Sequence, residues 1–309
     1  MPALVLGSRG SRLALWQTNM VRDAVVAAHP DVGVSIEVIH TRGDKILDVP
    51  LAKVGGKGLF VKEIEDALLD GRCDAAVHSL KDVPAELPGG LILGAACERE
   101  LPWDAFVSER HGAVTDLPEG ARVGTSSLRR VCQLLAMRPD LEVVPLRGNV
   151  ETRLRKLSEG LDAVVLAAAG LRRLGLGDRI TALLTPPEFV PAVGQGIVVV
   201  ECREGDAATR GLLASLDHGP TRVAMAAERA FLAAVGGSCQ VPLGAIATVD
   251  GDRVDVTGMI GRPDGGTILK DREAAASASA AEAGRRIAER LLGAGGREIL
   301  EQLTTAGGQ

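Results

Sequence analysis

Aromatic residues are scarce in this sequence of 309 residues: tyrosine is absent, and there are only four phenylalanines and two tryptophans. Proteins that recognise bases by stacking need aromatic side chains for it. We therefore expect any ligand to be held by charge and hydrogen bonds. A basic tail is also missing and the formal net charge is −5, which argues against a general nucleic-acid binder.

Cysteine and long apolar runs are scarce as well. The cysteine count is odd, the spacing is wide and no CxxC occurs, which argues against a zinc site or a disulfide framework. No apolar run approaches the length of a membrane span, and the opening MPALVLGSRGSR turns polar too early for a secretory signal. We expect a cytoplasmic protein without metal or membrane contact. The cysteines are Cys73, Cys97, Cys132, Cys202 and Cys239.

Arginine, in contrast, is abundant, with 28 residues against 7 lysines. Its planar guanidinium binds carboxylates bidentately, so the excess fits a carboxylate ligand. GC-rich coding would also raise arginine content, and composition alone leaves both explanations open. Hydrophobic residues make up 46% and charged residues 24%, as in soluble globular proteins, and the length favours two or three domains.

The chain contains an internal duplication. LLDGRCDAAVHSLKD and KLSEGLDAVVLAAAG both predict a helix, a glycine turn and a buried strand. Together with helices expected at 12–28 and 128–137, they indicate two α/β domains with parallel-rich sheets. Strands expected at 243–249, 253–260 and 267–271, joined by DGD and RPDGG, indicate a small C-terminal α+β domain.

Ligands of such α/β domains bind beyond the carboxyl ends of the strands. This rule selects the loops GSRGS, HSLKDVP, GTSSLRR and LRGN, all rich in hydroxyl and charged groups. We predict that they face a cleft between the two α/β domains and bind a ligand with several carboxylates. The candidate residues are Arg9, Ser11, Ser79, Lys81, Asp82, Thr125, Ser126, Arg129, Arg130, Arg147, Arg153 and Arg173.

Two of these loops carry specific chemistry. Asp82 in HSLKDVP is either a carboxylate that stabilises a cation and moves protons, or half of a solvated Lys-Asp pair. We interpret His78 as a strand residue rather than a base. In GTSSLRR the start of a helix favours an anion, and Arg129 and Arg130 there would be unfavourable without one.

Two further segments remain open on residues alone. VGGKGLFVKE lacks the GxxxxGK[ST] pattern of a phosphate loop, so a mobile lid carrying Lys53 and Lys57 is favoured over an ATP site. Cys239 in GGSCQVP is either buried and inert or reactive. A nucleophilic cysteine needs a base, and the nearest histidine, His218, lacks the local signature of cysteine hydrolases.

Taken together and in this order, HSLKDVP, GTSSLRR, LRGNV, AAAGLRRLG, PAVGQG and GGSCQVP resemble the porphobilinogen deaminase family over essentially the whole chain. The resemblance implies two α/β domains like those of type II periplasmic binding proteins and a small C-terminal α+β domain. The implied boundaries are 1–98 with 196–216, then 99–195, then 217–309.

The resemblance also implies an activity: a monomeric transferase that joins four porphobilinogen molecules head to tail into hydroxymethylbilane, with loss of ammonia, in tetrapyrrole biosynthesis. Its cofactor is a dipyrromethane primer, held by a thioether to the cysteine that Cys239 matches. Asp82 matches the catalytic carboxylate, which would stabilise the azafulvene cation left by ammonia. The other candidate residues match binding positions, and Lys53 and Lys57 fall on a flexible loop. Ser238 departs from the common EGGCQVP.

Two alternatives come from other classes of protein. A solute-binding receptor of the type II periplasmic-binding fold would need neither Asp82 nor Cys239, and it would usually carry an export signal. A cysteine hydrolase would need a partner base for Cys239.

Overall fold

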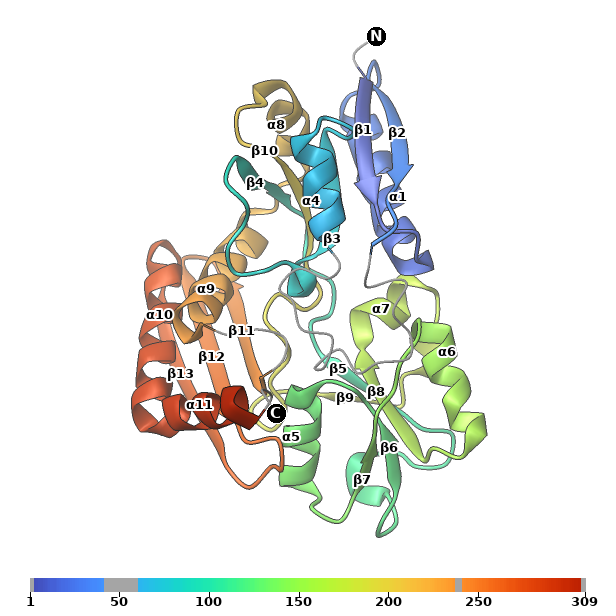
Figure 1. The fold of residues 1–309 in the computed structure, drawn as a ribbon, viewed down its shortest axis with the longest axis vertical. Coiled ribbons are helices and arrows are strands. Elements are labelled where there is room, and N and C mark those ends of the chain that lie inside the picture. Colours follow the sequence, from blue (N-terminus) through green and yellow to red (C-terminus); the bar gives the residue numbers. More distant parts are fainter. Residues whose placement is uncertain (1–2, 42–60, 237–240, 307–309) are drawn as a thin grey trace. The chain divides into compact units, whose positions relative to one another are not determined.

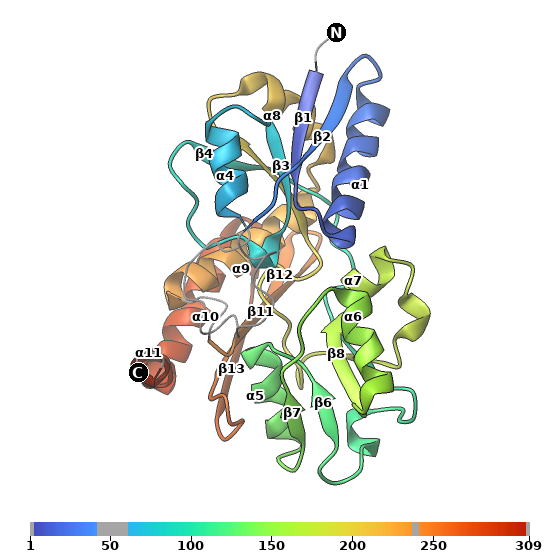
Figure 2. The same ribbon diagram turned by 45° about the vertical axis from the view of Figure 1, so that its right-hand side comes forward.

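The structure is a computed structural model that describes residues 3–41, 61–236 and 241–306 (Figures 1 and 2). These residues divide into two compact units. The first contains 3–41, 61–100 and 196–222; the second contains 101–195, 223–236 and 241–306.

The first unit is built on a five-stranded sheet of order β2-β1-β3-β10-β4. β1 is parallel to β2 and β3, whereas β10 is antiparallel to both of its neighbours. The elements are β1 (Ala3–Ser8), α1 (Arg12–Ala28), β2 (Gly33–Val38), α4 (Lys62–Leu69), β3 (Ala75–Ser79), β4 (Leu91–Ala96), β10 (Val198–Arg203) and α8 (Ala207–Leu213).

Each face of this sheet has its own core, because side chains alternate along a strand. On one face Val21 and Val25 of α1 pack with Ala75 and Val77 of β3. On the other, Ile64 of α4 packs with strand residues that include Ala76. Helices α1 and α4 therefore cover opposite faces, as Figure 2 shows.

The second unit contains a five-stranded sheet of order β7-β6-β8-β5-β9. β6 is parallel to β7 and β8, and β5 is antiparallel to both β8 and β9. The elements are β5 (Asp104–Val107), β6 (Arg122–Gly124), α5 (Leu128–Met137), β7 (Glu142–Val144), α6 (Val150–Arg155), β8 (Ala163–Ala167), α7 (Ala168–Arg173) and β9 (Ala182–Leu184).

The two sheets thus repeat one pattern: three parallel strands, then a strand that runs the other way, then an edge strand. This confirms the duplication and the α/β class expected from the sequence. The antiparallel strand in each sheet was not expected. β10 and β5 are far in sequence from the strands beside them, so the repeated β-α-β pattern does not include them.

A three-stranded antiparallel sheet completes the second unit, and α9 and α10 pack along it (Figure 1). The predicted hairpins are confirmed, although the last strand is longer than expected. The three-domain boundaries stay a prediction, since this sheet and the second five-stranded sheet fall in one compact unit. The elements are α9 (Gly219–Val235), β11 (Leu243–Asp250), β12 (Arg253–Gly261), β13 (Ile268–Ala276), α10 (Ala280–Leu291) and α11 (Arg297–Ala306).

Candidate functional site

In the first unit a small cavity opens where β1 and β3 end. Its lining includes Arg9 and Ser11 from the segment between β1 and α1, Gln17 of α1, and Ser79 and Asp82 after β3. Four of these five were predicted from the sequence as site residues. The parallel pairing of β1 with β3 explains why they meet, because it brings the carboxyl ends of the two strands to the same edge.

The turn that carries Asp82 is held from several sides. Leu80 N donates to Ile197 O at 3.0 Å, just before β10, and Val83 N donates back to Leu80 O at 3.0 Å. The Ser79 hydroxyl accepts from Gln17 Nε2 of α1 at 3.0 Å. Asp82 is therefore a half-buried carboxylate on an anchored turn rather than a freely solvated one.

Ser11 is the N-cap of α1. Its hydroxyl oxygen accepts from Ala14 N at 3.2 Å, which satisfies one of the donors that a helix start leaves open.

The first unit also contains two buried carboxylates that sequence reasoning missed, Glu65 and Glu201. His78 Nε2 lies 3.1 Å from Glu201 Oε2. This pairing confirms that His78 is a buried strand residue. A signal was present in the sequence, because Glu201 stands alone inside the apolar run GIVVVEC.

In the second unit the strand ends are held together by the Ser126 hydroxyl and by a backbone hydrogen bond of Thr125. Ser126 Oγ donates to Leu146 O at 2.8 Å and accepts from Leu146 N at 2.8 Å. Thr125 N donates to Val144 O at 2.9 Å. Thr125 and Ser126, both predicted site residues, thereby fix the start of α5 against the segment that follows β7.

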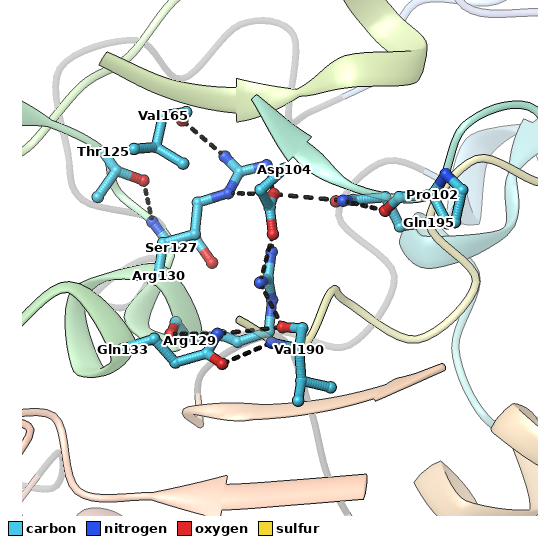
Figure 3. A network of polar contacts seen from close by, with 10 residues as sticks. All are labelled: Pro102, Asp104, Thr125, Ser127, Arg129, Arg130, Gln133, Val165, Val190 and Gln195. Carbon is cyan, nitrogen blue, oxygen red and sulfur yellow. Dashed lines mark hydrogen bonds and ion pairs between the residues drawn. The ribbon is translucent and has the colours of Figure 1, made fainter. Parts of the chain in front are cut away.

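Arg129 and Arg130, at the start of α5, converge on one carboxylate, Asp104 of β5 (Figure 3). Arg129 Nη1 donates to Asp104 Oδ2 at 2.7 Å, and Arg130 Nε donates to Oδ1 at 2.8 Å. The carbonyls of Val190 and Val165 accept further bonds from the two guanidinium groups, at 2.8 Å and 3.0 Å.

The charges in this network do not balance. Burial raises the pKa of Asp104, but Arg129 and Arg130 outweigh that effect and hold it at about 2. Two guanidinium groups therefore share one carboxylate, and Arg129 Nε is buried without a hydrogen-bond partner among the described residues. The network therefore holds more positive than negative charge in the interior.

Asp104 itself was not predicted, although it is the one charged residue in the short apolar stretch WDAFV and the first residue of β5. Its position changes what Arg129 and Arg130 require from a ligand. The anion that Arg129 and Arg130 require at the start of a helix is supplied in part by the protein.

The remaining predicted arginines lie in the second unit as well. Arg153 Nε donates to Gly148 O at 2.8 Å, Arg147 is half-buried before α6, and Arg173 is buried on α7. Lys81 is half-buried beside Asp82 in the first unit. Three predicted residues, Lys53, Lys57 and Cys239, lie outside the described residues, as does Ser238.

Together, the repeated sheet topology and the carboxylate and arginine groups at its strand ends define an α/β protein with two related five-stranded sheets and an added three-stranded antiparallel sheet. Some solved structures resemble the chain in fold alone. A nutrient-binding protein from Burkholderia cenocepacia bound to methionine is 13% identical with a TM-score of 0.43, covering 68% of this chain and 90% of that one. The methionine-binding protein MetQ is 12% identical with a TM-score of 0.44, covering 69% and 89%.

Sequence comparisons are far more specific. Residues 4–211 match the family model of the porphobilinogen deaminase dipyromethane cofactor binding domain, and residues 223–293 match that of the porphobilinogen deaminase C-terminal domain. The porphobilinogen deaminase of Roseiflexus castenholzii is 55% identical over 96% of this chain and 97% of that protein. That of Syntrophotalea carbinolica is 54% identical over 95% and 93%.

The chain belongs to the porphobilinogen deaminase family. It is a hydroxymethylbilane synthase, a transferase of tetrapyrrole biosynthesis that uses a dipyrromethane cofactor. The receptor alternative rests on fold alone. Across the described ranges, no helix has the length and apolar character needed to cross a membrane.

Proposed function

We propose that Asp82 is the catalytic carboxylate of this transferase and that Cys239 carries the dipyrromethane. The observation that carries the first assignment is the cavity of the first unit, where Asp82 lies on an anchored turn with Arg9, Ser11 and Ser79. A carboxylate that is already held in place can stabilise positive charge as it develops on the substrate, because the site does not have to reorganise during the reaction.

Asp82 then acts on the substrate pyrrole in two ways. As ammonia leaves porphobilinogen, positive charge spreads to the pyrrole nitrogen, and a carboxylate facing that N–H stabilises the charge. Once the α-carbon of a neighbouring pyrrole has formed a bond to the methylene carbon that ammonia left, that α-carbon loses its proton and the bonding pair restores the aromatic ring; the same carboxylate can accept that proton. The bound dipyrromethane supplies the primer to which substrate units are added.

The basic residues hold the acetate and propionate groups that every pyrrole unit carries. Arg9 does so in the first unit. In the second, the surplus charge of the pair formed by Arg129 and Arg130 supports the same role, because one carboxylate cannot neutralise two guanidinium groups. We assign the same class of contact to Ser11, Lys53, Lys57, Ser79, Lys81, Thr125, Ser126, Arg147, Arg153 and Arg173.

Elimination supports Cys239 as the attachment point. The other four cysteines are all buried. Burial raises the pKa of the Cys73 thiol to about 11 and that of the Cys132 thiol to about 12, and it also raises that of Cys202. Since the thiolate is the nucleophile, buried thiols are poor candidates for alkylation.

The same proposal covers the organisation and setting of the protein. We infer three domains, with residues 1–98 and 196–216 in the first, 99–195 in the second and 217–309 in the third. We infer a cytoplasmic monomer that acts on porphobilinogen and binds neither nucleic acid nor membrane.

Intact-mass measurement of the protein purified from a host that makes porphobilinogen tests Cys239. We expect the added mass of one dipyrromethane, its loss in Cys239→Ala and its retention in the control Cys97→Ala. A cofactor mass that survives Cys239→Ala would refute the attachment site.

The role of Asp82 is tested by Asp82→Asn, which keeps the shape of the side chain and removes its charge. We expect the cofactor mass to remain while hydroxymethylbilane production falls by roughly a hundredfold or more. The control Asp23→Asn, whose aspartate is 67% exposed on α1, should remain fully active. Near-normal turnover by Asp82→Asn would contradict the assignment.

A further inference from the structure

Three ionisable side chains are buried together in the first unit and have no role in the mechanism above. Glu65 comes from α4, His78 from β3 and Glu201 from β10, and they are 7%, 4% and 0% exposed. Buried carboxylates are costly unless they are paired, so a cluster with two of them calls for an explanation.

Sheet register explains why they meet. In the antiparallel pairing of β3 with β10, Val199 lies opposite His78 and Glu201 lies opposite Ala76. His78 and Glu201 therefore point to the same face as Ala76, and that face is the one that α4 covers. Glu65 reaches the same layer from α4, one residue after Ile64.

The two carboxylates are poorly compensated. Glu201 has the His78 ring at 3.1 Å, but neither of its oxygens accepts a hydrogen bond from the described residues, and Glu65 Oε1 accepts none either. Of the strands that contact α4, β1 and β4 carry no ionisable side chain. Arg203 of β10 directs its guanidinium to the carbonyls of Leu68 and Cys73.

This environment moves the ionisation of Glu65 into the neutral range. Its pKa is raised to about 7, first by burial and then by Glu201, with His78 lowering it and Asp66 adding a smaller rise. Glu65 therefore becomes negatively charged as the pH rises through about 7.

The cluster lies directly behind the candidate catalytic turn. His78 lines the same cavity as Ser79 and Asp82 and immediately precedes Ser79 in the chain. Glu201 sits on β10, and Ile197, just before that strand, anchors Leu80 of the turn. Through His78, which lies 3.1 Å from Glu201, the cluster thus reaches the cavity in which positive charge would develop on the substrate.

We propose that Glu65, in its ionised form, supplies buried negative charge in the layer behind the Asp82 turn, next to the pair formed by His78 and Glu201, and thereby stabilises the cationic pyrrole of the transferase reaction. This inference rests on the role proposed for Asp82. No covalent step is involved: the proton of Glu65 leaves to solvent before turnover, and the charge acts through the low-dielectric interior. Asp82 contacts the substrate, whereas Glu65 acts at a distance.

The same ionisation should cost stability. The pKa of Glu65 is raised above its ordinary value of 4.5, so its contribution to folding is full below about pH 4.5 and is lost as the pH rises through about 7. Activity should therefore rise with pH over the range in which this contribution to stability falls.

The test compares Glu65→Gln with the cofactor-loaded wild type from pH 6 to pH 9, measuring both kcat and the melting temperature. We expect the wild-type kcat to rise through about pH 7 and Glu65→Gln to lack that rise, ending roughly three- to tenfold lower at high pH. Between pH 6 and pH 9, the melting temperature of the variant should also fall by less than that of the wild type. Glu65→Asp, which keeps an ionisable group, should restore the rise.

Asp70→Asn, at the exposed end of the same helix, is the matched control and should follow the wild type. If Glu65→Gln does not fold, Glu201→Gln serves instead: removing that neighbouring charge should move the rise to lower pH by roughly one unit. An unchanged kcat profile in a folded, cofactor-loaded Glu65→Gln would overturn the inference. Product formation by the wild type at pH 8 separately tests the transferase function, so the two failures are distinguishable.

Discussion

Asp104 is the residue that links the stability of the second unit to its candidate binding groups. Its carboxylate is fully buried and accepts from Arg129, Arg130 and Gln195, the last at 3.2 Å (Figure 3). Without it, two guanidinium groups would remain in the interior with no counter-charge. Arg129 and Arg130 are thus both ligand-binding candidates and structural residues, and a variant of either would change both properties.

Replacing Asp104 by alanine should therefore destabilise the protein by roughly 3 to 5 kcal/mol. Its pKa of about 2 lies below the ordinary value of 3.8, so this stabilisation is present above about pH 3.8 and is lost as the pH falls through about 2. Urea unfolding of both proteins between pH 7 and pH 2.5 measures the difference, which should narrow in acid. Asp31→Asn, an exposed substitution, is the control. Equal stability of Asp104→Ala and wild type at pH 7 would contradict this account.

Among the elements, α9 and α10 pack closely against each other at Gly284. A Cβ at this position would lie 2.0 Å from Ala227 O and 3.2 Å from Phe231 N, both backbone atoms of α9. Backbone atoms cannot rotate away as a side chain can, so the absence of a side chain at Gly284 is what allows this helix packing.

Gly284→Ala should accordingly destabilise the protein by roughly 2 kcal/mol, in spite of the higher helix propensity of alanine. Gly293→Ala offers a matched control, because a Cβ there would meet nothing within 4 Å and should be neutral. Thermal unfolding of both variants measures the contrast. Equal melting temperatures of Gly284→Ala and Gly293→Ala would contradict this account, because they would show that α9 and α10 can move apart with little loss of stability.

For the whole molecule, the important feature is that the first unit is discontinuous in sequence. β10 lies between β3 and β4 in the sheet, yet the chain builds all of residues 101–195 in the second unit before returning. A central strand removed from a sheet leaves two open edges and an exposed core.

A fragment of residues 1–195 should therefore lose cooperative unfolding of the first unit, whereas 1–222, which retains β10 and α8, should keep it. Trp16 of α1 is a local probe once Trp103 is replaced by phenylalanine, since the chain has two tryptophans and no tyrosine. Urea titrations followed by fluorescence make the comparison. A cooperative Trp16 transition in 1–195 would show that β10 is dispensable.

Local patterns predicted a large share of this protein. The helices at 12–28 and 128–137 have the expected bounds, and the C-terminal hairpins follow from alternation and glycine turns. The loops at strand ends were also found, because the carboxyl ends of parallel strands meet at one edge. Arg9, Ser11, Ser79 and Asp82 do share a cavity.

What the sequence determined by itself is local: helix periodicity, turn chemistry and the ordered motifs that identify the family all lie within short segments. Only the tertiary structure decided which distant residues meet. The insertion of β10 places Glu201 beside His78, and the reversed β5 places Asp104 beneath Arg129 and Arg130. The physical reason is that sheet register and strand direction, set by residues far apart in the chain, determine where each buried charge finds its partner.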